Sequence, residues 1–125
     1  MGLSAAAAAV VASYRATPGG WLAIWFAEGM LAMAIAALAM KHKAEGERIA
    51  ALTAQLLAAE VNIVIDHYGN PVASMGENSP GFQAALRAIG SGRGWVKISA
   101  PYRSAGCDHA ALAARLLAEG GPDRL

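Results

Sequence analysis

The feature that most constrains this sequence is a run of twenty residues, Trp21 to Met40, in which Glu28 is the single charged residue. An α-helix rises about 1.5 Å per residue, so this run would reach about 30 Å, the thickness of a bilayer's hydrocarbon core. Tryptophans occur at its start and Lys41 to Lys43 follow its end, as is typical of the two interfaces of a membrane span. The run therefore predicts a transmembrane helix, and the alternative is a buried helix of a soluble protein.

The composition also favours a membrane protein, and it excludes some classes of partner. Of the 125 residues 56% are hydrophobic and 15% are charged, whereas a soluble domain carries about 25% charged residues. A net charge of +1 without a basic run argues against nucleic acid as a partner. A single cysteine rules out a disulfide within the chain and an all-cysteine zinc site. We therefore expect membrane lipid, and either further copies of the chain or other membrane subunits, as partners.

The periodicity of apolar residues divides the chain into four segments. Residues 1–20 are predicted to form a short alanine-rich helix or leader, and residues 21–40 the transmembrane helix. Residues 41–59 continue that helix with an amphipathic pattern, because Ile49, Leu52, Leu56 and Ala59 recur at intervals of three and four. Residues 60–125 are predicted to form a small α+β head.

Alternation and turn residues give the order of elements in the head. β-branched residues dominate from Val61 to Ile65, a turn follows, and Ser79 and Asp108 stand where helix N-caps are expected. The predicted order is strand 61–65, strand 72–75, helix 80–89, strand 95–99 and helix 109–119, which is ββαβα. The fold class predicted is thus α+β, with a long hydrophobic and amphipathic N-terminal helix followed by this head.

Small residues recur along one side of the predicted span. Such a seam lets two helices approach closely in lipid, where packing drives association. A carboxylate at this depth is costly unless it is paired or protonated, so Glu28 is a candidate interaction residue that would pair with another subunit. The helix-packing residues predicted are Ala23, Ala27, Glu28, Met30, Ala34 and Ala37.

Three groups of residues were considered as chemical sites, and none has the spacing that its chemistry needs. Cys107 and His109 stand two apart at a helix start, so they do not face each other as a catalytic dyad would. Adding Asp66 and His67 gives ligand types that suit zinc, but without a recognised ligand spacing. The glycines of residues 90–94 follow a helix and open a strand, the wrong order for a phosphate loop. We therefore predict no catalytic, cofactor-binding or metal residue, no cofactor, and a protein that is not an enzyme.

The arrangement of leader, hydrophobic helix with a glutamate near its start, amphipathic continuation and small head resembles type IV pilins, most closely the shufflon-type minor pilins. The residues that carry the resemblance are WFAEGMLAMAIAALAM around Glu28, then AQLLAAEVNIVIDHYGNP and GFQAALRAIG. In that family the glutamate pairs with the terminal amine of the next subunit. The resemblance implies a single-pass structural or assembly subunit of an envelope complex, located in the bacterial inner membrane, that acts by helix–helix packing.

Two alternatives stay open. The segment from Ile65 to Ser74 resembles the D-x-x-G hairpin of Cache or PAS-like sensor modules, which implies a ligand-sensing head on a membrane anchor. The other alternative is a soluble α+β protein with a helical oligomer core. The side on which the head lies is also open, although Lys41, Lys43 and Arg48 after the span favour a cytoplasmic head.

Overall fold

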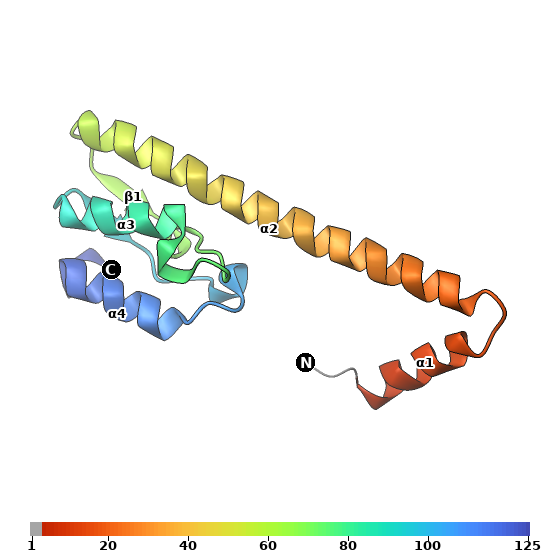
Figure 1. Cartoon of the computed structure of the whole chain (residues 1–125). Helices are drawn as coiled ribbons and strands as arrows, with labels where there is room; N and C mark the ends of the chain where they lie inside the picture. Colours follow the sequence, from red (N-terminus) through yellow and green to blue (C-terminus); the bar gives the residue numbers. More distant parts are fainter. Residues whose placement is uncertain (1–3) are drawn as a thin grey trace. The chain divides into compact units, whose positions relative to one another are not determined.

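Four α-helices and two β-strands are found in the part of the chain that the structure describes. The computed structural model describes residues 4–125, apart from the side chain of Tyr14, so the first three residues of the predicted leader lie outside it. The elements are α1 (Ala5–Arg15), α2 (Gly20–Ala58), β1 (Ile63–Ile65), α3 (Pro80–Gly90), β2 (Gly94–Val96) and α4 (His109–Gly120), as Figure 1 shows. The chain divides into two compact units, Met1–Leu38 and Ala39–Leu125.

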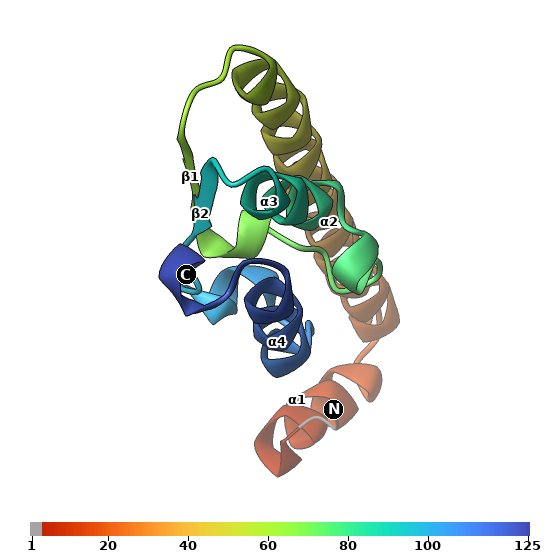
Figure 2. The ribbon, with the colours of Figure 1, turned by 90° about the vertical axis from the view of Figure 1, so that its left-hand side faces the viewer.

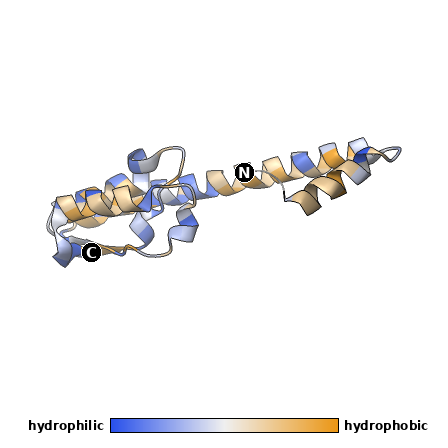
Figure 3. Cartoon of the chain, turned by 90° about the horizontal axis from the view of Figure 1, so that it is seen from below, coloured by the Kyte–Doolittle hydropathy of each residue, from blue (hydrophilic) through white to orange (hydrophobic). Residues whose placement is uncertain are grey.

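Helix α2 contains both the apolar run and the amphipathic stretch in 39 continuous residues. Its most apolar window has a mean hydropathy of 1.9, and none of that window is buried. Figure 3 shows hydrophobic residues predominating in the N-terminal half of α2, with hydrophilic residues more frequent in its C-terminal half. The predicted long apolar helix near the N-terminus is confirmed. By length and composition α2 can cross a membrane, and that it does so stays a prediction.

The second unit is built on a two-stranded parallel sheet. β1 pairs with β2 in a register that places Ile63 beside Gly94 and Ile65 beside Val96. α3 connects the two strands, so β1, α3 and β2 form a β-α-β unit, and Figure 2 shows α3 beside the strands and α4 beside α3. The buried core shared by these elements includes Ile63, Ile65, Phe82, Leu86, Ile89, Val96, Leu112 and Leu116.

The predicted ββαβα order is wrong at its second strand. Residues 72–75 are not a strand: residues 73–75 form a turn, and a 3-10 helix, η2 (Gly76–Asn78), follows them. The Ser79 hydroxyl accepts a hydrogen bond from the Val72 amide at 2.8 Å and donates one to the Gly76 carbonyl at 2.7 Å, which holds this segment folded back on itself. The strand that pairs with β1 is β2, so the head is βαβα and its sheet is parallel.

Three glycines meet where α2, α3 and the segment after β1 come together. A Cβ at Gly81 would overlap the Gly69 carbonyl oxygen and lie 3.2 Å from the Gly46 Cα, while Gly69 itself has φ +78°. Only glycine allows this approach of backbone to backbone. The sequence alone suggests Gly46 as a bend in a helix, whereas α2 is unbroken there and Gly46 is a buried packing position.

The two predicted helix N-caps behave differently. Asp108 caps α4 as predicted, because its carboxylate accepts a hydrogen bond from the Ala111 amide at 3.0 Å. Ser79 precedes α3 with Pro80 at the first helical position, but its hydroxyl bonds backward to the preceding turn. Of these two residues, only Asp108 caps its helix with a side-chain hydrogen bond.

Candidate functional site

Polar side chains gather where the two parallel strands end. Asp66 and His67 follow β1, and Lys97 and Ser99 follow β2 by one and three residues. Parallel pairing brings both carboxyl ends to the same edge of the sheet, which is where ligands of parallel α/β proteins bind. The topology therefore assembles a polar edge from residues about thirty positions apart in the chain.

The central contact of this edge joins His67 and Ser99. The imidazole Nδ1 lies 3.0 Å from the Ser99 Oγ, and both side chains are half-buried. When Nδ1 carries the proton and donates it to Ser99, the tautomer leaves Nε2 unprotonated and basic. His67 then has the form that a general base needs, with its ring orientation fixed by the serine.

Backbone strain is concentrated at the same place. His67, Tyr68 and Asn70 have φ values of +54°, +56° and +53°, and Gly69 lies between them at +78°. Each non-glycine residue in this left-handed region costs about 1 kcal/mol or more, and such residues are often found at functional sites. The chain is held there by the Tyr68 amide, which donates to the Lys97 carbonyl at 3.2 Å, and by the buried Tyr68 ring.

Charged groups flank the histidine on two sides. The Lys97 ammonium lies 3.1 Å from the Asp66 carboxylate in an exposed pair that contributes little to stability. Asn70 donates from Nδ2 to the Glu45 carboxylate at 3.5 Å, and Arg103 lies 3.9 Å from the same carboxylate. The Asn70 Oδ1 is buried without a hydrogen-bond partner, which leaves an acceptor available beside the site.

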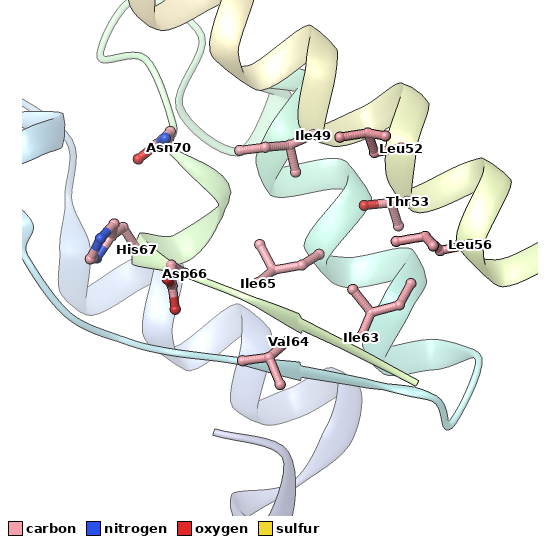
Figure 4. Close-up of a pocket in the computed structure, with 10 residues that line it drawn as sticks. All are labelled: Ile49, Leu52, Thr53, Leu56, Ile63, Val64, Ile65, Asp66, His67 and Asn70. Carbon is pink, nitrogen blue, oxygen red and sulfur yellow. The ribbon is translucent and has the colours of Figure 1, made fainter. Parts of the chain in front are cut away.

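A groove of about 270 Å³ lies between β1 and the C-terminal half of α2, and Figure 4 shows its lining. Ile63 and Ile65 lie on the side of β1 toward α2, while Val64 lies on the opposite side. The groove is apolar over most of its length and polar at the end where His67 and Asn70 stand. Its lining residues are Ile49, Leu52, Thr53, Leu56, Ile63, Val64, Ile65, Asp66, His67 and Asn70.

A second serine–histidine pair ties the chain together before α4. The Ser104 Oγ lies 2.9 Å from the His109 Nε2, Ser104 is only 5% exposed, and the His109 ring stacks at a tilt on Tyr68 with 5.5 Å between ring centroids. Burial raises the pKa of the nearby Cys107 thiol above its ordinary value, which keeps it protonated. This pair is a packing contact, and the cysteine and histidine form no dyad.

Asp66, His67, Cys107 and His109 are not brought together as a metal site. Within residues 4–125, no group of three or more His, Cys, Asp or Glu side chains could hold a metal ion.

The part of the chain that contains this polar edge matches a known protein family. A family model described as amidohydrolase matches residues 51–125, more than half of the chain. The chain belongs to the amidohydrolase family. No curated protein and no solved structure matches it. The match covers β1, β2 and the four residues of the polar edge, and it begins within α2.

Membership of the amidohydrolase family corrects the prediction that the protein is not an enzyme. That prediction rests on spacing along the chain, where Asp66 and His67 can be grouped with Cys107 and His109 but not with Lys97 and Ser99. Lys97 and Ser99 were missed as site residues. A signal was present, because Asp66 follows one predicted strand and Lys97 and Ser99 belong to another, but only the parallel pairing of the two strands shows that these residues share one edge.

The predicted helix-packing residues all lie in the first unit, on α2. All six are exposed within the chain, and the described residues place no partner against Glu28. Ala23 and Ala27 line a hollow with Val10 and Val11 of α1, and the packing of the seam against a helix of another subunit stays a prediction. Its members are Ala23, Ala27, Glu28, Met30, Ala34 and Ala37.

Proposed function

We propose that the chain hydrolyses an amide bond at the carboxyl edge of β1 and β2, with His67 as the general acid–base. The observation that carries the proposal is the 3.0 Å contact between His67 Nδ1 and Ser99 Oγ at the edge where parallel strands place their ligands. The left-handed backbone at His67 supports it, because strain of this kind persists where an orientation is functional. The amidohydrolase family match covers the same residues.

The reaction uses the tautomer in which His67 Nδ1 donates its proton to the Ser99 Oγ. His67 Nε2 takes a proton from a water molecule, whose oxygen attacks the amide carbonyl carbon and forms a tetrahedral intermediate. The imidazolium then returns the proton to the amide nitrogen, the C–N bond breaks, and the products are a carboxylic acid and an amine. Ser99 acts as a positioning residue, and the Lys97 ammonium supplies positive charge at the edge where negative charge develops.

Replacing Ser99 tests this arrangement. We expect Ser99→Ala to lower kcat about tenfold with little change in KM, because the imidazole keeps its place but loses its fixed tautomer. The measurement is hydrolysis of acetyl, butyryl, hexanoyl and benzoyl p-nitroanilides by the full chain in detergent micelles.

The matched control is Ser104→Ala, which removes the other serine–histidine contact. It is expected to lower the melting temperature and to leave kcat unchanged, because the buried Ser104 bonds to His109 and not to His67. Absence of hydrolysis of all four anilides by the wild-type chain, or equal loss of kcat in both variants, contradicts the proposal.

We further propose that α2 anchors the chain in a membrane and associates there with another helix through its small-residue seam. The support is the length and hydropathy of α2, the absence of any buried residue from its apolar window, and the recurrence of alanine along one side. Glu28 would then meet a cationic or hydrogen-bonding group of the partner helix.

Filling the seam with larger side chains tests the association. We expect the double variant Ala27→Leu and Ala34→Leu to lose at least about half of its cross-linked product in membranes, because the added side chains keep the helices apart. The control is Ala32→Leu with Ala39→Leu, a pair of alanines of α2 outside the seam that are also seven residues apart. Equal cross-linking in the two double variants argues against the seam.

A further inference from the structure

The groove between β1 and the C-terminal half of α2 begins at the candidate site. Asp66 and His67 belong to the polar edge and also line the groove, so the site and the groove share residues. Figure 4 shows His67 at one end of the groove and Leu56 at the other. A substrate that is bound at His67 can therefore extend along the groove, between the helix and the strand.

The interior of the groove is apolar and has the length of a medium-sized alkyl chain. Its walls are Ile49, Leu52 and Leu56 on α2, and Ile63 and Ile65 on β1. Leu52 is 51% exposed, so part of this apolar wall is in contact with solvent. From Ile49 to Leu56 the helix rises about 10 Å. An extended chain of about eight carbons has nearly this length, because carbon–carbon bonds are about 1.5 Å long.

The charged groups around the groove favour a neutral occupant. Asp66 is the one formally charged residue of its described lining, and it lies at the polar end, where its carboxylate is 3.1 Å from the Lys97 ammonium. The Glu45 carboxylate lines the adjoining hollow near the same end. At the far end, Leu56 and Ile63 are uncharged. An acid would meet like charge at the polar end, and at the apolar end it would lose hydration without gaining an ionic partner.

We propose that the groove holds the acyl part of the substrate, so that the substrate is a neutral amide of a linear, medium-chain carboxylic acid. This inference rests on the amide hydrolysis proposed for His67 and names its substrate class. The amide lies at the polar end, and the alkyl chain passes Leu52 and ends beside Leu56. Water adds to the carbonyl carbon and the C–N bond breaks, which gives the medium-chain acid and an amine. Leu52 and Leu56 thereby determine the length of acyl chain that the site accepts.

The dependence of hydrolysis on chain length tests the proposal. The full chain is placed in lipid nanodiscs, because the alkyl chains of a detergent would compete for the groove. The probes are acetyl, butyryl, hexanoyl and octanoyl p-nitroanilides and the mono-p-nitroanilide of hexanedioic acid. We expect kcat/KM to rise about two- to fourfold with each added methylene as far as octanoyl, because each one buries apolar area. The acidic anilide is expected to fall at least about tenfold below the hexanoyl anilide.

Two variants place the acyl chain along the groove. Leu56→Trp is expected to remove the gain from hexanoyl to octanoyl, and Leu52→Trp to remove the gain beyond butyryl, because Leu52 lies nearer to the polar end. The matched control is Leu117→Trp on α4, where a leucine that is 47% exposed lies outside the groove, and it is expected to keep the wild-type profile. A ratio of two substrates on one protein is unaffected by loss of folded chain or by partition of the anilides into lipid.

Binding of octanamide to His67→Asn separates this inference from the reaction. We expect octanamide, but not acetamide, to slow amide exchange in β1, because a ligand that binds the folded state stabilises it. Hydrolysis with equal kcat/KM for the acetyl and octanoyl anilides, without an effect of octanamide, overturns the acyl groove and leaves the reaction at His67 standing. Absence of hydrolysis together with slower exchange in octanamide overturns the reaction and supports the groove as an acyl-amide site. A Leu56→Trp profile equal to that of the wild type also overturns the inference.

Discussion

Replacing Gly81 by alanine is expected to lower the free energy of unfolding of the second unit by about 3 kcal/mol or more. The added methyl group would overlap the Gly69 carbonyl oxygen and lie 3.2 Å from the Gly46 Cα. None of these atoms can move cheaply, because they are backbone atoms and Gly69 lies in a left-handed segment. The measurement is hydrogen exchange of the β1 and β2 amides followed by mass spectrometry, which reports stability in this unit.

The control for this substitution lies on the same helix. A Cβ at Gly90 would meet the carboxylate of Glu119 at 3.0 Å, which is the far end of a flexible side chain. Gly90→Ala is therefore expected to change the free energy of unfolding by less than about 1 kcal/mol. Equal exchange rates in Gly81→Ala and Gly90→Ala would contradict the close contact of the three glycines.

His67→Asn is expected to reduce kcat by about 10² to 10⁴ while the unit stays folded. Asparagine tolerates the left-handed backbone that residue 67 adopts at φ +54°, so the substitution removes the base without adding strain. Hydrolysis of the p-nitroanilides gives kcat, and amide exchange in β1 and β2 checks the fold. The loss is expected to exceed that of Ser99→Ala, because Ser99 only positions the ring.

The control for the histidine is His42→Asn, which changes the same residue type on α2 at a position that does not line the groove. We expect it to leave kcat within about twofold of the wild-type value. Retention of full activity by His67→Asn with a protected sheet would remove His67 from the reaction, and equal losses in the two variants would show that the effect is general.

Local pattern predicted several elements well. The apolar run and the stripe at Ile49, Leu52 and Leu56 predicted the long helix, because helical periodicity is a property of neighbouring residues. The Asp108 cap and the end of α3 at Gly90 were predicted for the same reason. The strand predicted at residues 72–75 was wrong, since alternation cannot say which strand β1 pairs with.

The candidate site could not be predicted from the local pattern of the sequence. His67 was visible as a titratable residue, but it was grouped with Cys107 and His109 because these were the chemically reactive residues in the sequence. Its partner Ser99 stands 32 residues away and becomes a neighbour only when β1 and β2 run parallel. The prediction that the protein is not an enzyme failed at this step.

By itself the sequence determined where the apolar helix lies, how long it is, and which residues form its amphipathic half, because these depend on spacings of three and four residues. Only the tertiary structure decided that β1 pairs with β2, that three glycines meet at one point, and that His67 faces Ser99. Each of these is a contact between backbone segments distant in the chain. Their geometry is set by strand direction and close packing, which no local pattern of side chains encodes.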